Sequence, residues 1–154
     1  MIKKRFLLIL LVFPFVVPFV VPTESEEVEQ IFPPQAIIVA AYQGDLELVR
    51  EILITGPDKD ARNAFGDTAL HVAIFQNDLS VVKLLLDYGF DPNAKTLRNG
   101  YTPLHNAVAA NNVEAARLLL QYKADKRIKS LDGRTPFEKA NKEEKRALVM
   151  LLYK

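Results

Sequence analysis

An internal repeat constrains the fold of this chain more than any other feature of its sequence. Three glycines open the similar phrases GDTALHVA, GYTPLHNA and GRTPFEKA, 34 and 33 residues apart, and they are Gly66, Gly100 and Gly133. A leucine-rich segment follows the first two phrases, at residues 79–95 and 113–129. A period in the low thirties indicates supersecondary units that stack on one another, not a single globule.

Each unit has the apolar spacing of two short helices. In the second copy Leu70 and Ala73 belong to one apolar run and Val81 and Leu85 to the next, with the polar residues QND between them. Apolar residues three and four positions apart line one face of a helix. The leucine triplet of each second helix is therefore expected in the core: Leu84, Leu85, Leu86, Leu118, Leu119 and Leu120.

These units resemble the ankyrin repeat, whose consensus contains G-x-T-P-L-H-x-A-A and then L-L-L-x-x-G-A-D-x-N. Residues 100–125 match this consensus closely and residues 66–94 nearly as well, while 36–62 and 133–154 diverge as end repeats do. The resemblance implies an all-α solenoid of stacked helix-turn-helix units with short hairpin-like turns. The expected domain is 35–154, with repeats at about 35–65, 66–99, 100–132 and 133–154.

The chain departs from the ankyrin consensus at three turn positions. Asn77 and Asn111 replace the glycine between the two helices, and Lys123 replaces the glycine after the second helix. Asparagine tolerates the left-handed backbone conformation, so the turns between helices are expected to keep their shape.

Both histidines of the chain follow a threonine by three residues. The threonine stands where a helix N-cap belongs, and a side chain three residues later can reach back to the cap. In the last repeat glutamate takes the histidine's place, and Thr-x-x-Glu is a capping box. On this interpretation His105→Glu should be mild, while Thr102→Ala should cost about 1 kcal/mol. The predicted caps pair Thr68 with His71, Thr102 with His105, and Thr135 with Glu138.

The sequence favours a protein without catalytic activity, metal or cofactor. Equivalent positions of adjacent repeats lie about 8–10 Å apart, whereas zinc holds its ligand nitrogens at about 2.0–2.1 Å. The chain has no cysteine, which removes thiolate ligands, disulfides and a cysteine nucleophile. It has no Ser-His-Asp set, nucleophile elbow or glycine-rich phosphate loop. We therefore predict that the protein is not an enzyme.

The predicted partner-binding surface is the concave side of the stack, formed by the turns and the first helix of each unit. The ankyrin resemblance places its residues beside the glycine of each phrase and two or three positions past its alanine. Phe75 and Tyr101 lie in the middle repeats, so we expect them at its centre and expect little loss of stability when either is replaced. Each aromatic side chain could instead cover neighbouring turns. The predicted residues are Tyr42, Phe65, Asp67, Phe75, Gln76, Arg98, Asn99, Tyr101 and Arg134.

Charge is distributed unevenly along the repeats. Residues 33–99 contain six Lys/Arg and nine Asp/Glu, a net charge of −3, whereas residues 100–154 contain eleven and six, a net charge of +5. Such runs form solvated faces or match a partner of complementary polarity, and Lys142 and Lys145 are expected to act as exposed rim charges. The overall charge of +1 gives no indication of nucleic-acid binding.

The first 22 residues have the layout of a secretory signal. Basic residues at 3–5 precede sixteen residues, 6–21, that are apolar or proline. An uncleaved membrane anchor is the alternative, but a spanning helix needs about 20 apolar residues and two prolines interrupt this shorter run. The sequence therefore predicts a signal peptide or N-terminal membrane anchor at 1–22, followed by an acidic, proline-containing linker at 23–34.

Together these features predict an exported protein that is periplasmic, at the cell surface or secreted. Its repeat domain is expected to bind one or more proteins of that compartment, and to contact a membrane only through residues 1–22 if they remain attached. The alternative function is that of an accessory factor, chaperone-like or inhibitor-like, dedicated to one exported enzyme. Both functions would use the same surface.

Overall fold

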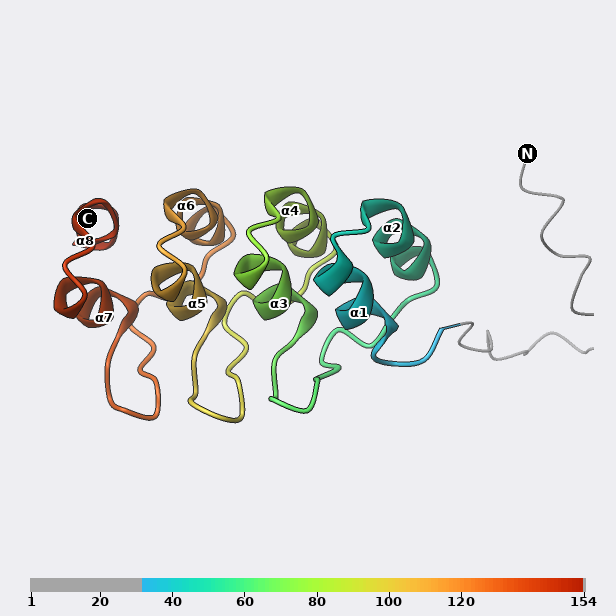
Figure 1. The fold of residues 1–154 in the computed structure, drawn as a ribbon, viewed down its shortest axis with the longest axis horizontal. Helices are drawn as coiled ribbons and strands as arrows, with labels where there is room; N and C mark the ends of the chain where they lie inside the picture. Colours follow the sequence, from blue (N-terminus) through green and yellow to red (C-terminus); the bar gives the residue numbers. More distant parts are fainter. Residues whose placement is uncertain (1–31, 154) are drawn as a thin grey trace, which may run out of the picture.

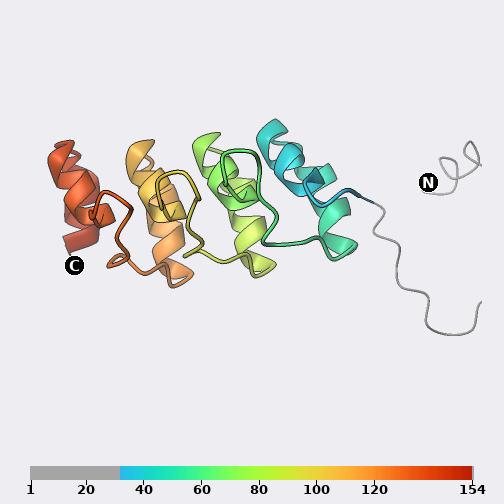
Figure 2. The same ribbon diagram turned by 90° about the horizontal axis from the view of Figure 1, so that it is seen from below.

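The structure, a computed structural model, describes residues 32–153, which form an all-α stack of four helix pairs (Figures 1 and 2). The predicted solenoid is confirmed. The predicted export segment and the linker up to residue 31 lie outside the described residues. The first helix of each pair lies in an inner layer and the second in an outer layer, and the turns between pairs project to one side. The helices are α1 (Ala36–Gln43), α2 (Leu46–Ile54), α3 (Ala69–Phe75), α4 (Leu79–Asp87), α5 (Pro103–Ala109), α6 (Val113–Gln121), α7 (Pro136–Lys142) and α8 (Arg146–Tyr153).

A left-handed asparagine and the N-cap residue after it reverse the chain between the two helices of each middle repeat. Asn77 and Asn111 adopt left-handed φ values of 61° and 54°, as predicted, and Lys123 after α6 adopts 64°. Asp78 and Asn112 follow the two asparagines, and their side-chain oxygens accept backbone amides of the outer helices at 2.8–3.1 Å. A left-handed residue followed by an N-cap turns the chain and starts the next helix within two residues.

The leucine triplets form much of the core between the layers. Leu84, Leu85 and Leu86 are 9%, 0% and 4% exposed, and the prediction for α4 is confirmed. Of the α6 triplet only Leu119 is buried, while Leu118 and Leu120 are half-buried at the edge of the core. Three consecutive residues span about 200° of a helix, so all three are buried, as in α4, only where neighbouring elements cover more than one side of it.

The turns between helix pairs are hydrogen-bonded to one another. The Leu131 amide donates to the Asn99 carbonyl at 2.9 Å, and the Lys95 amine donates to the Lys129 carbonyl at 2.8 Å. The Arg62 guanidinium donates to the Lys95 carbonyl at 2.7 Å. Because each turn is tied to the next, the turns hold the concave side in one shape.

Two equivalent glycines give a matched test of this contact between turns. Gly66 and Gly133 have φ values of +80° and +79°, but a Cβ at Gly66 would lie 2.5 Å from Leu97 Cβ, whereas at Gly133 no described atom lies within 4 Å. We expect Gly133→Ala to lower the free energy of unfolding by about 1 kcal/mol and Gly66→Ala by about 3 kcal/mol, because overpacking adds to backbone strain. Urea denaturation measures both; equal losses would mean that the turn carrying Leu97 yields freely.

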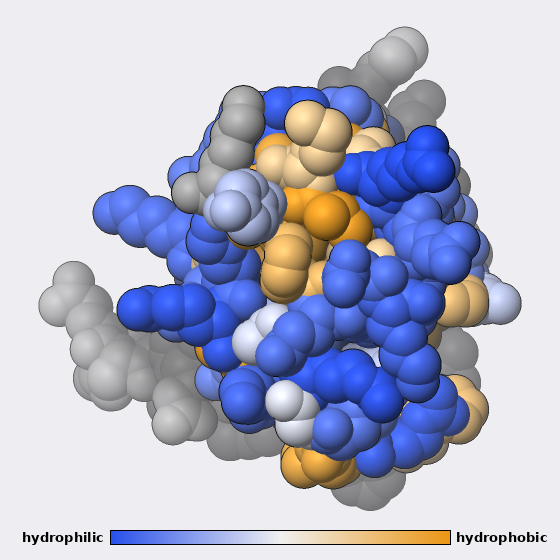
Figure 3. All heavy atoms as spheres, turned by 90° about the vertical axis from the view of Figure 1, so that its left-hand side faces the viewer, coloured by the Kyte–Doolittle hydropathy of each residue, from blue (hydrophilic) through white to orange (hydrophobic). Residues whose placement is uncertain are grey.

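The last repeat forms the end of the stack seen in Figure 3. The sixth residue of the inner helix is the buried Ile74 in α3 and the buried Val108 in α5, but it is the exposed Asn141 in α7. The outer helix differs, because Met150 and Tyr153 of α8 are 69% and 80% exposed. Figure 3 shows apolar side chains gathered on one part of this end, with hydrophilic ones around them. The inner helix of the last repeat is thus adapted to solvent, and the outer helix less so.

Candidate partner-binding site

Hydrogen bonds at the start of the inner helices fix the concave side. Nδ1 of His71 accepts the Thr68 amide at 3.3 Å and lies 2.8 Å from the Thr68 hydroxyl oxygen. His105 and Thr102 repeat the arrangement in α5, at 3.2 Å and 2.9 Å. In α7 the Glu138 carboxylate accepts the amide of the preceding N-cap threonine at 2.7 Å. The structure therefore has a capping box at each of these positions.

The second nitrogen of each histidine joins one repeat to the next. Nε2 of His71 lies 3.0 Å from the Tyr101 carbonyl oxygen, and Nε2 of His105 lies 3.0 Å from that of Arg134. A carbonyl oxygen only accepts, so Nε2 carries the proton and Nδ1 is the acceptor. The sequence predicted the cap but not this contact with the following turn.

Burial favours the neutral form of both histidines. Burial lowers the pKa of His71 to about 4, although the hydrogen bond to the Tyr101 carbonyl and the nearby carboxylate of Asp67 oppose the shift. Burial also lowers the pKa of His105. Each imidazole uses both ring nitrogens in structural hydrogen bonds, so neither nitrogen is available to a substrate.

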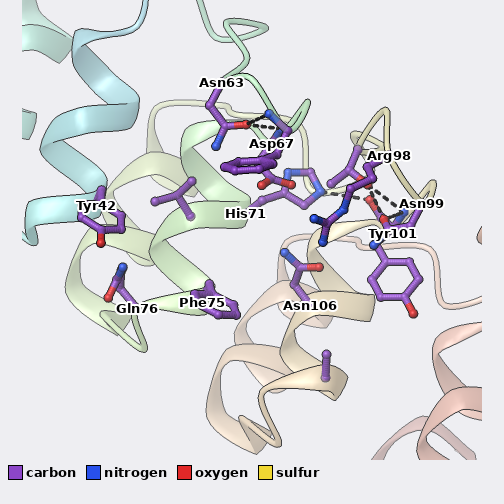
Figure 4. Close-up of a pocket in the computed structure, with 14 residues that line it drawn as sticks. Tyr42, Asn63, Asp67, His71, Phe75, Gln76, Arg98, Asn99, Tyr101 and Asn106 are labelled. Atoms are coloured by element: carbon purple, nitrogen blue, oxygen red, sulfur yellow. Dashed lines mark hydrogen bonds between the residues drawn. The ribbon is translucent and has the colours of Figure 1, made fainter.

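A pocket of about 480 Å³ lies on the concave side, between the inner helices and the turns (Figure 4); we call this pocket the groove. It brings together residues of three successive repeats. It is also lined by residues that were not predicted to face a partner: Asn63 and Asn106, and the buried Thr96, Val72 and His71. The predicted partner-binding residues that line the groove are Tyr42, Phe65, Asp67, Phe75, Gln76, Arg98, Asn99 and Tyr101.

Arg134 is the one predicted partner-binding residue that does not line the groove. It is half-buried, and its guanidinium forms an ion pair with Asp132 at 2.8 Å. Its carbonyl receives the hydrogen bond from His105. Arg134 is thus held in the turn before α7, where its backbone joins the third repeat to the fourth.

Tyr101 lines the groove but also belongs to the packing of the stack. Its ring lies 5.2 Å from the His105 ring at an interplanar angle of 19°, and Lys139 Nζ lies 4.9 Å from the Tyr101 ring centroid. The Lys139 amine also donates to the tyrosine hydroxyl at 3.0 Å. The expectation that replacing Tyr101 leaves stability unchanged does not fit this half-buried position. It does fit Phe75, which is 75% exposed.

Hydrogen bonds from a lysine attach the last repeat to α5, and ion pairs within the repeat hold that lysine. Lys139 and Lys145 both pair with Glu143 at 2.7 Å. The Lys145 amine also donates to the carbonyls of Val108 and Ala109 at the end of α5, at 2.5 Å and 2.9 Å. Partial burial opposes the negative charge of Glu143, but the hydrogen bonds from both lysines lower its pKa. The prediction that Lys145 is an exposed rim charge is wrong, because its side chain is only 16% exposed.

Within residues 32–153, no three side chains of the metal-ligating types His, Cys, Asp and Glu come together. No helix in the same range is long and apolar enough to cross a membrane.

Comparison with known proteins agrees with this architecture. The chain matches the model of the family described as ankyrin repeats (three copies) over residues 37–130 and 91–154. The protein belongs to the ankyrin repeat family, as the sequence phrases predicted. Ankyrin repeats indicate a protein–protein interaction module, and the family is typically non-catalytic. A search of curated proteins finds no match.

Proposed function

We propose that this is an exported ankyrin-repeat protein that binds partner proteins along the groove and catalyses no reaction of its own. The observation that carries the proposal is the set of exposed aromatic side chains lining one pocket. Tyr42, Phe65 and Phe75 are 65%, 60% and 75% exposed. Aromatic residues are the ones that most often carry binding energy at protein interfaces, and an exposed cluster of them marks an interaction site.

The histidines support the non-catalytic part of the proposal. A general base needs a nitrogen or oxygen that can take a proton from a substrate. Both nitrogens of His71 and of His105 are already hydrogen-bonded to threonine and to the next turn. An activity assay against a panel of ester, peptide and phosphoester substrates tests this part, and turnover lost in a folded His71→Gln variant would contradict it.

Export is supported by the pattern of residues 1–22, in which basic residues precede an apolar segment. We expect the mature chain to begin between Thr23 and Ile31, because the apolar segment ends at residue 21 and the acidic linker follows. Mass spectrometry of the protein from a fractionated cell measures the mature mass. An intact Met1 in the membrane fraction would favour the anchor, and an intact chain in the cytosol would contradict export.

Replacing the most exposed groove aromatic should separate binding from folding. We expect Phe75→Ala to weaken partner binding by about 2 kcal/mol, as truncation of an aromatic hot spot does. The thermal midpoint should barely change, because the Phe75 ring is 75% exposed. Affinity purification from the envelope fraction supplies the partner, and titration against wild type and variant gives the two affinities.

Tyr88→Ala is the matched control, because Tyr88 is an exposed aromatic that follows α4 and does not line the groove. Its replacement should leave affinity unchanged. If Phe75→Ala and Tyr88→Ala bind the partner equally well, the groove is not the binding surface.

A further inference from the structure

The concave side changes its chemistry from the first repeat to the last. The fourth residue of the inner helix is valine in α1 and α3, then Asn106 in α5 and Lys139 in α7. Tyr42 of α1 and Phe75 of α3 have exposed aromatic side chains, whereas Lys142 of α7 has an exposed amine. The seventh residues of the inner helices are, in order, Tyr42, Phe75, Ala109 and Lys142. This surface is therefore apolar over α1 and α3, and polar to basic over α5 and α7.

Arg98 places a positive charge within the groove (Figure 4). Its guanidinium carbon lies 5.8 Å from the centre of the Phe65 ring. None of the ion pairs among residues 32–153 includes Arg98. A guanidinium that rests on an aromatic face keeps its N–H groups for another acceptor, and its planar fork matches a carboxylate.

Asp67 gives the groove a direction. Its carboxylate lines the same pocket at the start of α3, and none of the ion pairs among the described residues includes it. A like charge is repelled there, whereas Arg98 attracts it on the side toward α5. The net charges of −3 for residues 33–99 and +5 for residues 100–154 also attract a negative charge toward the later repeats. A carboxylate on a bound partner is therefore favoured toward α5 and α7.

We propose that the groove selects a short segment of a partner protein in which an aromatic or aliphatic side chain is accompanied, toward α7, by aspartate or glutamate side chains. The apolar side chain packs on Tyr42 and Phe75, and the first carboxylate binds Arg98. This inference rests on the proposed function and adds the chemistry of the partner to it. A volume of about 480 Å³ holds a few side chains, so a short segment suffices.

The geometry of the stack gives the spacing within that segment. Packed helices lie about 8–10 Å apart, and an extended chain advances about 3.3 Å per residue. One repeat thus corresponds to about three residues of the partner. Carboxylates that reach Arg98 or Lys142 lie about three to six residues from the apolar side chain.

Selection from a phage-displayed library of random peptides tests the proposal, with the protein purified from the cells that make it. Peptides of about 12 residues span the groove. The enriched peptides should share an aromatic or aliphatic residue with Asp or Glu about three to six positions away. A synthetic enriched peptide should bind Arg98→Glu at least about tenfold more weakly than wild type, since a hydrogen bond between charged groups is lost. Exchanging its acidic residues for their amides should weaken binding to wild type by a similar factor.

Arg50→Glu is the control for the change of charge, because Arg50 is exposed on the outer helix α2 and does not line the groove. It should bind the peptide as wild type does. Enriched peptides without acidic residues, equal binding by Arg98→Glu, or no enriched peptide at all would overturn the inference. The proposed function survives these results if Phe75→Ala still weakens binding of the natural partner, and fails if that variant binds normally.

Discussion

Lowering the pH from 7 to 4 is expected to remove about 3 kcal/mol from the free energy of unfolding through His71 alone. The pKa of this histidine is about 4 in the folded protein and 6.5 for an unperturbed side chain. Between these values the unfolded chain binds a proton that the folded chain does not bind. The free energy of unfolding therefore falls as the pH falls from about 6.5 to about 4, by about 1.4 kcal/mol per pH unit. Above pH 6.5 the contribution of His71 is nearly constant.

The hydrogen bonds explain why the folded protein resists this proton. In the neutral ring Nδ1 accepts the Thr68 amide, and Nε2 donates to the Tyr101 carbonyl. A proton on Nδ1 would face another donor and place a charge in a site with 0% exposure. His105 has the same arrangement and a lowered pKa, so it adds to the loss of stability in the same direction.

Urea denaturation at a series of pH values, on wild type and His71→Gln, measures the effect. Glutamine keeps one acceptor and one donor without titrating in this range, and it is a capping-box residue. Protonation of carboxylates with lowered pKa values, such as those of Glu138 and Glu143, also lowers the free energy of unfolding in acid, but it does so equally in both proteins. The variant should therefore show the shallower pH dependence. Identical slopes between pH 6.5 and 4 would assign the acid sensitivity to the carboxylates.

Much of the fold could be predicted from the sequence because the same N-cap residues and the same leucine spacing recur in successive repeats. Three phrases with threonine at the N-cap fix where the inner helices start, and polar residues such as Asp78 and Asn112 fix the start of the outer ones. Leucine spacing then indicates the buried face. The end of the stack is harder to predict, because its residues face no described repeat. The polar Asn141 and the apolar Met150 of the same repeat show that no single rule of periodicity applies there.

The candidate site was predictable to the extent that the repeat register determines it. Residues at equivalent positions of successive repeats face the same side, so most of the predicted surface lines one groove. Contacts between repeats were not predictable, since spacing within a repeat carries no information about them. Lys139 and Lys145 are ordinary surface lysines in the sequence, yet one covers the Tyr101 ring and the other binds carbonyls of α5. The links from His71 and His105 to the next turn were missed for the same reason.

His105→Glu is expected to lower the free energy of unfolding by about 3 kcal/mol or more, in contrast to the mild effect that the sequence alone predicts. Glu138 occupies the equivalent position in α7, but there it is exposed. His105 is 0% exposed, and its Nε2 lies 3.0 Å from the Arg134 carbonyl oxygen. An introduced carboxylate could still accept the Thr102 amide, but its other oxygen would face a carbonyl that needs a donor. It would also be a buried charge, and the two lysines that act electrostatically on this position already have partners: Lys139 pairs with Glu143, and Lys95 donates to the Lys129 carbonyl.

Comparison with His105→Gln isolates that charge, because the two introduced side chains have nearly the same size. The glutamine variant keeps a donor for the Arg134 carbonyl, so it should lose only about 1 kcal/mol. Urea denaturation at pH 7 and at pH 5 separates them further. Wild type becomes less stable on acidification, because burial lowers the pKa of His105. The difference in free energy of unfolding between the glutamate variant and wild type should become smaller at pH 5, since a protonated carboxyl group can donate to the Arg134 carbonyl. Equal stability of the two variants at pH 7 would mean that the cap alone governs this position, and that the contact with the following turn contributes little.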